Sequence, residues 1–460
     1  MTTDGLRAAT DKMRAAGVPD LAVSEFSRFH AQLRSAATGT IPENTIEPLT
    51  EVTHLDDVRS DEAAVAEALG RTVVIKLNGG LGTSMGISGP KSALPVRDGL
   101  TFLDIIARQV LALRQRHGVQ TPLVLMNSFR TREESLAILA GHPGLEVDGL
   151  PLDFVQNKEP KLRADDLAPV EWPDDPTLEW CPPGHGDIYV ALQTTGLLDA
   201  LRERGLRYAF LSNADNLGAT CEGAVPAWMA RDGIPYVTEV CTRTRNDRKG
   251  GHLGVRRSDG RLVLRDSAMV AEGEDHFFQD TDRHPWFHAN NLWVDLDALA
   301  ERLAERDGIL GLPIIVNRKT VDPTRPDSTP VIQVESAMGA AVEVFDGSRA
   351  LAVDRSRFRP VKTTNELLLI RSDIYRLTDD FLVESTIDHD EPFVDLAKPY
   401  ALVDGFEKRF PRGVPSIRGC TSLRVEADTT FGADVVCTGD VRVTGGVRTI
   451  ADGAHLEGEV

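Results

Sequence analysis

Residues 77–92 read Leu-Asn-Gly-Gly-Leu-Gly-Thr-Ser-Met-Gly-Ile-Ser-Gly-Pro-Lys-Ser, and this glycine-rich stretch is the strongest indication of the fold. The apolar, β-branched run 73–75 precedes it and predicts a strand. Residues 101–104 follow as a capping-box-like helix start, and apolar residues then recur at helical spacing. A strand, a glycine loop and a helix present backbone N–H groups, with Lys91, to a phosphate chain such as that of a nucleoside triphosphate.

Two better-known glycine motifs do not fit this stretch. The dinucleotide-binding motif G-x-G-x-x-G fails because Met85 stands where the third glycine belongs. A Walker loop fails because Pro90 separates Gly89 from Lys91. A simple flexible turn is the alternative, but five glycines and a lysine are more than a turn requires.

Composition indicates a large protein and argues against nucleic acids and membranes as binding partners. The 460 residues exceed one typical core, so we expect two or three domains. The 51 basic and 70 acidic residues give a net charge of −19, which argues against a nucleic-acid or anionic-membrane surface. Five cysteines without a C-x-x-C pair, no signal sequence and no apolar run of about 20 residues predict a cytoplasmic protein with no membrane role.

The order of predicted elements indicates an α/β protein. Residues 1–70 look helical and are read as an N-terminal appendage, and from 71 to about 345 strands alternate with helices. This alternation is typical of a mostly parallel sheet covered by helices on both faces, in which ligands bind at the carboxyl ends of the strands. The expected strands after the first are 122–126, 152–155, 208–211, 236–240 and 292–294.

The C-terminal part has a different period. Apolar residues recur every six positions in two phases with glycines between them, which predicts short stacked strands in a left-handed β-helix. An ordinary antiparallel sheet is the alternative. The first phase comprises Val425, Phe431, Cys437 and Val443, and the second comprises Val435, Val441 and Val447.

Seven strings of sequence, in this order, resemble the UTP:glucose-1-phosphate uridylyltransferases of the eukaryotic type, also called UDP-glucose pyrophosphorylases. The resemblance covers roughly residues 70–460. Its specificity lies in the agreement of several long strings in both type and order. The strings are residues 77–92, 126–129, 182–189, 213–220, 249–251, 290–293 and 357–364.

The resemblance implies an α/β fold with a Rossmann-like, GT-A-like mixed sheet. With the helical pattern of the first residues and the hexapeptide period, it indicates a helical segment 1–70, a catalytic domain 71–400 and a C-terminal left-handed β-helix 401–460. In some members of the family the β-helix mediates subunit contacts, which implies an interaction role here, such as homo-oligomer formation. The implied reaction transfers a uridylyl group from UTP to glucose 1-phosphate with Mg²⁺, giving UDP-glucose and pyrophosphate. A phosphate monoester has a second pKa of about 6, so the attacking phosphate needs no general base.

Asp215 is the candidate metal ligand, because it follows an apolar run and Mg²⁺ prefers a few carboxylates with phosphate oxygens. By resemblance Lys91 and Lys362 are the catalytic residues. UTP is expected to contact Leu77, Asn78, Gly79, Gly80, Lys91, Met126, Gln156, Gly184, Asp215 and Lys362. The sugar phosphate is expected to contact His185, Asn213, Asp215, Lys249, Gly250, Asn290, Asn291 and Glu335.

Some of these assignments leave alternatives open. His185 lies between two glycines, which indicates an exposed loop, although a structural histidine is the other interpretation. Gln156 offers both an amide donor and an acceptor to a uracil edge. Lys249 is either a phosphate contact or part of a turn, and the sequence does not say whether Asn290 or Asn291 points inward.

Departures from the family pattern are local. Ile87-Ser88 stands where Cys-Lys is common, so the loop lacks one positive charge; Ala214 and the pair 288–289 also differ.

Two rival functions remain. One is a pyrophosphorylase for an N-acetylhexosamine 1-phosphate, against which the string 184–187 argues. The other is a non-catalytic nucleotide-sugar-binding scaffold, against which Lys91, Asp215 and Lys362 together argue.

Overall fold

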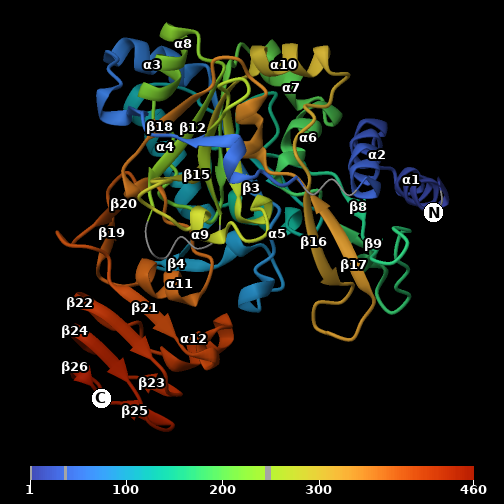
Figure 1. The fold of residues 1–460 in the computed structure, drawn as a ribbon. Helices are drawn as coiled ribbons and strands as arrows, with labels where there is room; N and C mark the ends of the chain where they lie inside the picture. The colour runs from blue at the N-terminus through green and yellow to red at the C-terminus, as the bar shows by residue number, and fades with distance from the viewer. Residues whose placement is uncertain (1–2, 36–38, 244–249) are drawn as a thin grey trace.

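The computed structural model describes residues 3–35, 39–243 and 250–460. Its centre is a mixed sheet with helices on both faces, and a smaller β-rich unit lies at the C-terminal end (Figure 1). The predicted mixed α/β class is therefore confirmed. Along its main path the sheet runs β2 (Thr53–His54), β18 (Arg349–Ala352), β12 (Tyr236–Thr242), β15 (Trp286–Asp295), β11 (Tyr208–Asn213), β3 (Thr72–Asn78), β6 (Leu123–Asn127) and β7 (Asp153–Val155).

The sheet consists of two parallel halves joined by one antiparallel strand. β11, β3, β6 and β7 are mutually parallel, as are β12, β18 and β2, whereas β15 runs antiparallel to β11 and β12. The strands expected at 208–211, 236–240 and 292–294 all lie in these elements. The sheet is thus less parallel than the alternation of elements indicated.

Helices cover both faces because the strands are apolar on both sides. In β3, Val74 packs in the core cluster that contains the helix residues Phe102 and Ile106, while Val73 and Ile75 pack in the cluster on the other face. The helix that follows the glycine loop begins at Thr101 with the predicted capping box to Asp104. The helices around the sheet are α4 (Phe102–His117), α5 (Arg132–Leu139), α6 (Ile188–Thr194), α7 (Leu197–Glu203), α8 (Ala224–Asp232), α9 (Asp275–Phe278), α10 (Leu296–Glu305) and α11 (Thr364–Arg371).

The N-terminal segment is more closely tied to the sheet than an appendage. Its helices α1 (Thr3–Ala15), α2 (Asp20–Arg34) and α3 (Glu62–Gly70) agree with the predicted helical character. However, β1 (Ile46–Pro48) pairs with β13 (Gly251–Arg256), and β2 pairs with β18. Residues 46–54 therefore belong to the central sheet, which the helical reading of residues 1–70 missed.

Short hairpins extend the sheet and its surroundings. β13 pairs with β14 (Leu262–Asp266) and touches β15. A separate three-stranded sheet projects from the body as a long hairpin (Figure 1). It comprises β16 (Ile315–Thr320), β17 (Pro330–Glu335) and β9 (Leu162–Arg163). Two-stranded pairs are formed by β4 (Pro95–Arg97) with β5 (Leu100–Thr101), β8 (Glu159–Pro160) with β10 (Trp180–Cys181), and β19 (Tyr375–Leu377) with β20 (Val383–Ser385).

The C-terminal unit contains parallel ladders rather than an antiparallel sheet. All four first-phase residues are buried, as are Val435 and Val441, but Val447 is 84% exposed and does not continue the second phase. Residues 393–396 form the first strand of this unit, so it begins before residue 401, the predicted boundary. One ladder joins β21 (Phe393–Leu396), β22 (Ser416–Val425), β24 (Val436–Val443) and β26 (His455–Glu459), and another joins β23 (Thr429–Phe431) and β25 (Arg448–Ile450), beside α12 (Val403–Arg409). A left-handed winding stays a prediction.

Within the described ranges, no helix has both the length and the apolar character needed to cross a bilayer.

Candidate active site

The register of the parallel strands aligns the ends that carry the predicted UTP contacts. Asn213 at the end of β11 is paired with Leu77 of β3, and Leu77 is paired with Met126 of β6. Asn127 is in turn paired with Val155 of β7, which directly precedes Gln156. Because these strands are parallel, segments far apart in sequence meet at one edge of the sheet.

Gly79 is needed for a close approach to Gln156. A Cβ at Gly79 would lie 2.5 Å from Gln156 Nε2 and 2.9 Å from its Cδ. The Gln156 backbone N–H donates to Asn127 O at 2.8 Å, which fixes the residue at the end of β7. The predicted uracil contact, Gln156, therefore lies directly against the glycine loop.

Polar side chains beneath the loop hold its first turn. Asn78 Nδ2 donates to Asn127 Oδ1 at 2.8 Å and to Ser135 Oγ at 2.7 Å, and Ser92 Oγ donates to Asn78 Oδ1. Asn78 is 4% exposed, so its side chain anchors the loop and leaves only its backbone for a nucleotide. Met126 is likewise buried in the core, which limits a UTP contact there to the main chain.

Lys91, near the end of the glycine loop, forms an ion pair with Asp215. Lys91 Nζ lies 2.7 Å from Asp215 Oδ2, and the two side chains are 17% and 20% exposed. The other oxygen, Asp215 Oδ1, is buried and has no hydrogen-bond partner among the described residues. A carboxylate oxygen without a hydrogen-bond partner is suited to a hard cation that substrate phosphates also bind.

The protein groups near Asp215 fit Mg²⁺, which takes few protein ligands, better than a metal ion that is coordinated only by protein side chains. No group of three histidine, cysteine or acidic side chains is arranged to hold a metal anywhere in the described ranges. Mg²⁺ commonly takes one or two carboxylates and completes its shell with phosphate oxygens and water. Asp215 supplies such a carboxylate at the strand end where the phosphates are expected.

Backbone pairing brings Lys362 to the same place. Val361 N–H donates to Asp215 O at 3.1 Å, and Pro360 forms a β-bridge with Asn216. Lys362 follows immediately and is exposed at the start of α11, whose N-cap is Thr363. The backbone next to Lys362 thus meets Asp215, although Lys91 and Lys362 are 271 positions apart in sequence, and the Lys362 ammonium lies 5.9 Å from the centre of the Phe358 ring.

His185 is held in a defined tautomer. Met338 N–H donates to His185 Nδ1 at 2.9 Å, so the ring proton of the neutral imidazole resides on Nε2. Burial lowers the pKa of His185 to about 4, which keeps the ring neutral near pH 7. The side chain is only partly covered, and Nε2–H is available as a donor.

The glycines on either side of His185 permit a tight crossing with residues 335–336. Gly184 has a φ of +79°, and a Cβ there would lie 2.7 Å from Ser336 O. Gly186 N–H donates to Ser336 O at 2.8 Å. Glu335, the predicted sugar contact, therefore lies beside Gly184, and burial raises the pKa of its carboxyl.

The structure distinguishes Asn290 from Asn291. Asn290 has a φ of +55° and donates from Nδ2 to Asn213 Oδ1 at 3.1 Å, toward the aligned strand ends. Asn291 is fully buried and donates to Glu239 Oε2 at 3.0 Å and to Arg357 O at 3.2 Å. We therefore expect Asn290 to contact the sugar, whereas the Asn291 side chain lies in the core.

A buried ion pair beneath the site was not recognised in the sequence. Arg357 Nη2 lies 2.6 Å from Glu239 Oε1, and Arg357 Nε donates to Glu239 Oε2 at 2.9 Å. Arg357 O accepts from Asn216 Nδ2 at 3.0 Å, and Arg357 Nη2 donates to Thr220 O at 2.9 Å. A signal was present, because Glu239 is the one acid in the apolar run 236–241.

This pair joins three segments that carry site residues. Glu239 contacts Asn291 next to Asn290, while Arg357 holds the loop that follows Asp215 and begins the segment that ends at Lys362. We call Glu239 and Arg357, with these contacts, the buried knot.

Two predicted sugar contacts remain. Gly250 has a φ of +117° and lies against the Phe287 ring, and Lys249 lies outside the described residues.

The chain is similar to known proteins over most of its length. A family model described as UTP–glucose-1-phosphate uridylyltransferase matches residues 23–438. The UTP–glucose-1-phosphate uridylyltransferase of Solanum tuberosum is 38% identical over 399 residues, which are 86% of this chain and 79% of that protein. That of Hordeum vulgare is 35% identical over 439 residues, which are 94% of this chain and 90% of that protein.

Solved structures agree with these relatives. A UDP-glucose phosphorylase from Trypanosoma brucei has a TM-score of 0.92 and 41% identity, covering 100% of this chain and 99% of that one. A point mutant of the Leishmania major UDP-glucose pyrophosphorylase, in complex with UDP-glucose, has a TM-score of 0.91 and 40% identity, covering 100% of both chains.

Proposed function

This chain belongs to the UTP–glucose-1-phosphate uridylyltransferase family, and we propose how its own residues carry out the transfer. The enzyme converts UTP and glucose 1-phosphate into UDP-glucose and pyrophosphate. A phosphate oxygen of the sugar attacks the α-phosphorus of UTP, the new P–O bond forms, and the bond to the pyrophosphate oxygen breaks. The nucleophile is already anionic near pH 7, so positioning and charge neutralisation remain as the tasks of the protein.

The nucleotide binds at the aligned strand ends. Gln156 pairs with the uracil edge, with Gly184 beside the base and Gly79 and Gly80 under the phosphates. Lys91 neutralises the triphosphate from the side of the glycine loop, and Lys362 neutralises it from the start of α11. The support for this placement is the ion pair of Lys91 with Asp215, together with the hydrogen bond from the Val361 N–H, next to Lys362, to Asp215 O.

The sugar phosphate binds opposite the nucleotide. His185 donates from Nε2 to a phosphate oxygen of glucose 1-phosphate. Because the pKa of His185 is lowered, the ring stays neutral and does not compete with the phosphate for a proton. Asn290 and Asn213 contact sugar hydroxyls, with Glu335 near the sugar. The amide hydrogen bond from Met338 supports this role, because it leaves Nε2 as the donor.

Asp215 would hold Mg²⁺ through Oδ1. When bound, the ion would supply positive charge that neutralises substrate phosphate. The buried, unpartnered Oδ1 supports this assignment. Activity that persists in excess EDTA, after Mg²⁺ has been removed, would contradict it.

One observation carries the proposal: the Lys91–Asp215 pair at 2.7 Å, with Asp215 Oδ1 left free, at the edge where the predicted UTP contacts converge. The experiment is pyrophosphate release from UTP, Mg²⁺ and a panel of sugar 1-phosphates. Glucose 1-phosphate should be the preferred substrate. Faster release with an N-acetylhexosamine 1-phosphate would favour the rival substrate class, and no release with any sugar would favour a non-catalytic scaffold.

We also infer that the C-terminal ladders wind as a left-handed β-helix and mediate homo-oligomer formation. β26 pairs with β24 on one side only, so its outer edge offers unpaired backbone groups to a second copy. Light scattering of the full chain at micromolar concentration should give a mass above 50.2 kDa. A monomeric mass contradicts this inference. The cytoplasmic location likewise stays a proposal.

A further inference from the structure

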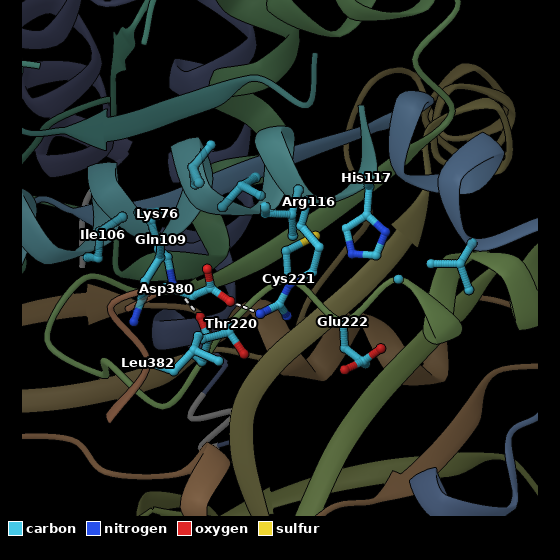
Figure 2. Close-up of a pocket in the computed structure, with 16 residues that line it drawn as sticks. Lys76, Ile106, Gln109, Arg116, His117, Thr220, Cys221, Glu222, Asp380 and Leu382 are labelled. Carbon is cyan, nitrogen blue, oxygen red and sulfur yellow. Dashed lines mark hydrogen bonds and ion pairs between the residues drawn. The ribbon is translucent and has the colours of Figure 1, made fainter. Parts of the chain in front are cut away.

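A cavity lies between β3, α4 and the loop that follows Asp215 (Figure 2). Its volume is about 270 Å³, which is close to the lower limit for small-molecule sites. Besides polar residues, six branched aliphatic side chains from four different parts of the chain line it. They are Val65, Val74, Ile106, Val110, Leu113 and Leu382.

Lys76 is the buried cation of this cavity. It is 2% exposed, and its Nζ donates to Ser212 Oγ at 2.8 Å and to Ala219 O at 2.6 Å. Both acceptors are neutral, and this ammonium forms no ion pair with a carboxylate of the described ranges. Burial lowers the pKa of Lys76 to about 7, because the charged form lacks full compensation.

The acids around Lys76 have other partners. Figure 2 shows Asp380 and Glu222 in the wall with Arg116, His117 and Cys221. An anion entering the cavity would therefore not displace an existing carboxylate from Lys76. The partners are Arg357 for Glu239, Lys91 for Asp215, Arg116 for Asp380 and the Ala224 N–H for Glu222.

We propose that this cavity binds a small monocarboxylate with an apolar body, whose carboxylate pairs with Lys76 and whose body contacts the aliphatic walls. A buried charge is stabilised by a hydrogen-bonded counterion, and aliphatic walls favour an apolar ligand body. Dianions such as sugar phosphates are disfavoured, because the lining Arg116 is already paired with Asp380, Lys76 alone offers an unpaired positive charge among the described lining residues, and Glu222 lies in the same wall. The ligand touches the amine that also holds Ala219 at the end of the Asp215 loop.

The test uses benzoate as the probe and benzyl alcohol as its neutral analogue. Binding to the full chain is measured by ligand-observed NMR and calorimetry without nucleotide, so the result does not depend on the proposed reaction. Benzoate should bind at least about tenfold more tightly than benzyl alcohol, as expected for a hydrogen bond to a charged group. Equal affinities, or no binding of benzoate at millimolar concentration, would overturn the proposal and leave a cavity filled by water.

Two variants and a control locate the site. Lys76→Met should weaken benzoate at least about tenfold while benzyl alcohol changes little. Leu113→Trp fills the cavity but retains Lys76, and it should abolish binding of both probes. Lys408→Met, on the exposed surface of α12, should bind as the unmodified chain does. Unchanged benzoate binding by the cavity-filling variant, with a normal melting curve, would place the probe elsewhere and overturn the proposal.

Discussion

His185 illustrates how a single contact defines the role of a side chain. The Met338 N–H occupies Nδ1, so only Nε2 can donate to a ligand. We predict that His185→Ala weakens the binding of glucose 1-phosphate about tenfold and the binding of UTP much less, because one hydrogen bond to an anion is lost. Titration calorimetry with each substrate measures both. Equal losses would assign His185 to loop structure.

Lys362 is exposed in the structure and its ammonium lies over the Phe358 ring, yet the Val361–Asp215 hydrogen bond brings the adjacent backbone to the Lys91–Asp215 pair. Lys362→Met keeps most of the stem and removes the charge. Turnover should fall about 100-fold or more, in line with ~3 kcal/mol for an electrostatic contact to the transition state, and UTP affinity should change less. Near-normal kcat would show that Lys362 is an ordinary surface charge. The exposed Lys408→Met is the matched control.

Gly79 tests the geometry of the loop. Gly79→Ala places a methyl group 2.5 Å from Gln156 Nε2, so the Gln156 side chain must move. We predict about tenfold weaker UTP binding with the fold retained, because the amide can no longer hold the proposed uracil contact. Gly446→Ala is the control, since a Cβ there meets nothing within 4 Å. Unchanged UTP affinity in Gly79→Ala would remove Gln156 from the nucleotide site.

At the scale of elements, the buried knot ties β12, β15 and the segment before α11 together. Glu239 is 0% exposed, and its side chain also accepts the Trp293 Nε1–H at 3.0 Å. Glu239→Gln leaves the Arg357 guanidinium buried without its counter-charge. We predict a loss of about 3 kcal/mol or more in the free energy of unfolding, measured by urea denaturation.

The control for the knot is another glutamate-to-glutamine change in an ion pair. Glu384 and Arg376 pair with side chains 49% and 65% exposed, so Glu384→Gln should cost less than about 1 kcal/mol. Because the knot also positions Asn290 and Lys362, kcat should fall more in Glu239→Gln than in the control. Similar unfolding free energies for the two variants would show that the buried pair contributes no more than a surface pair.

At the scale of the whole molecule, buried histidines couple stability to pH. Burial lowers the pKa of His185 to about 4 and those of His252 and His288 to about 3, from the ordinary value of 6.5. Above pH 6.5 neither the folded nor the unfolded chain protonates these rings, so their contribution is fully present. As pH falls from 6.5 toward 4, the unfolded chain takes up protons that the folded state excludes, and stability is lost.

The measurement is the free energy of unfolding of the full chain against pH, compared with His252→Asn. The variant should lose less stability between pH 6.5 and 4, because one of these groups has been removed. Burial raises the pKa of Asp187 to about 6, which opposes the trend, but this effect is common to both proteins and cancels in the comparison. Parallel pH profiles would contradict the assignment for His252.

The sequence by itself determined the class of the fold and named most of the candidate site residues. Local patterns suffice for this, because strand 72–78, its glycine loop and the capped helix at 101 depend on residues that are neighbours in the chain. The strings that carry the family resemblance are equally local. The hexapeptide period likewise indicated a C-terminal unit distinct from the main sheet.

Only the tertiary structure decided which side chains share the site and which ones lie beneath it. The antiparallel strand β15 has a bulge opposite Glu239, and this bulge turns Asn290 toward Asn213 and Asn291 into the core. The sequence does not show which of these two adjacent asparagines faces the site. The Glu239–Arg357 ion pair and the hydrogen bonds Met338–His185 and Lys76–Ala219 also join residues more than 100 positions apart. Pairing over such distances is set by packing of the whole chain, because no local pattern specifies which distant partner a buried polar group will find.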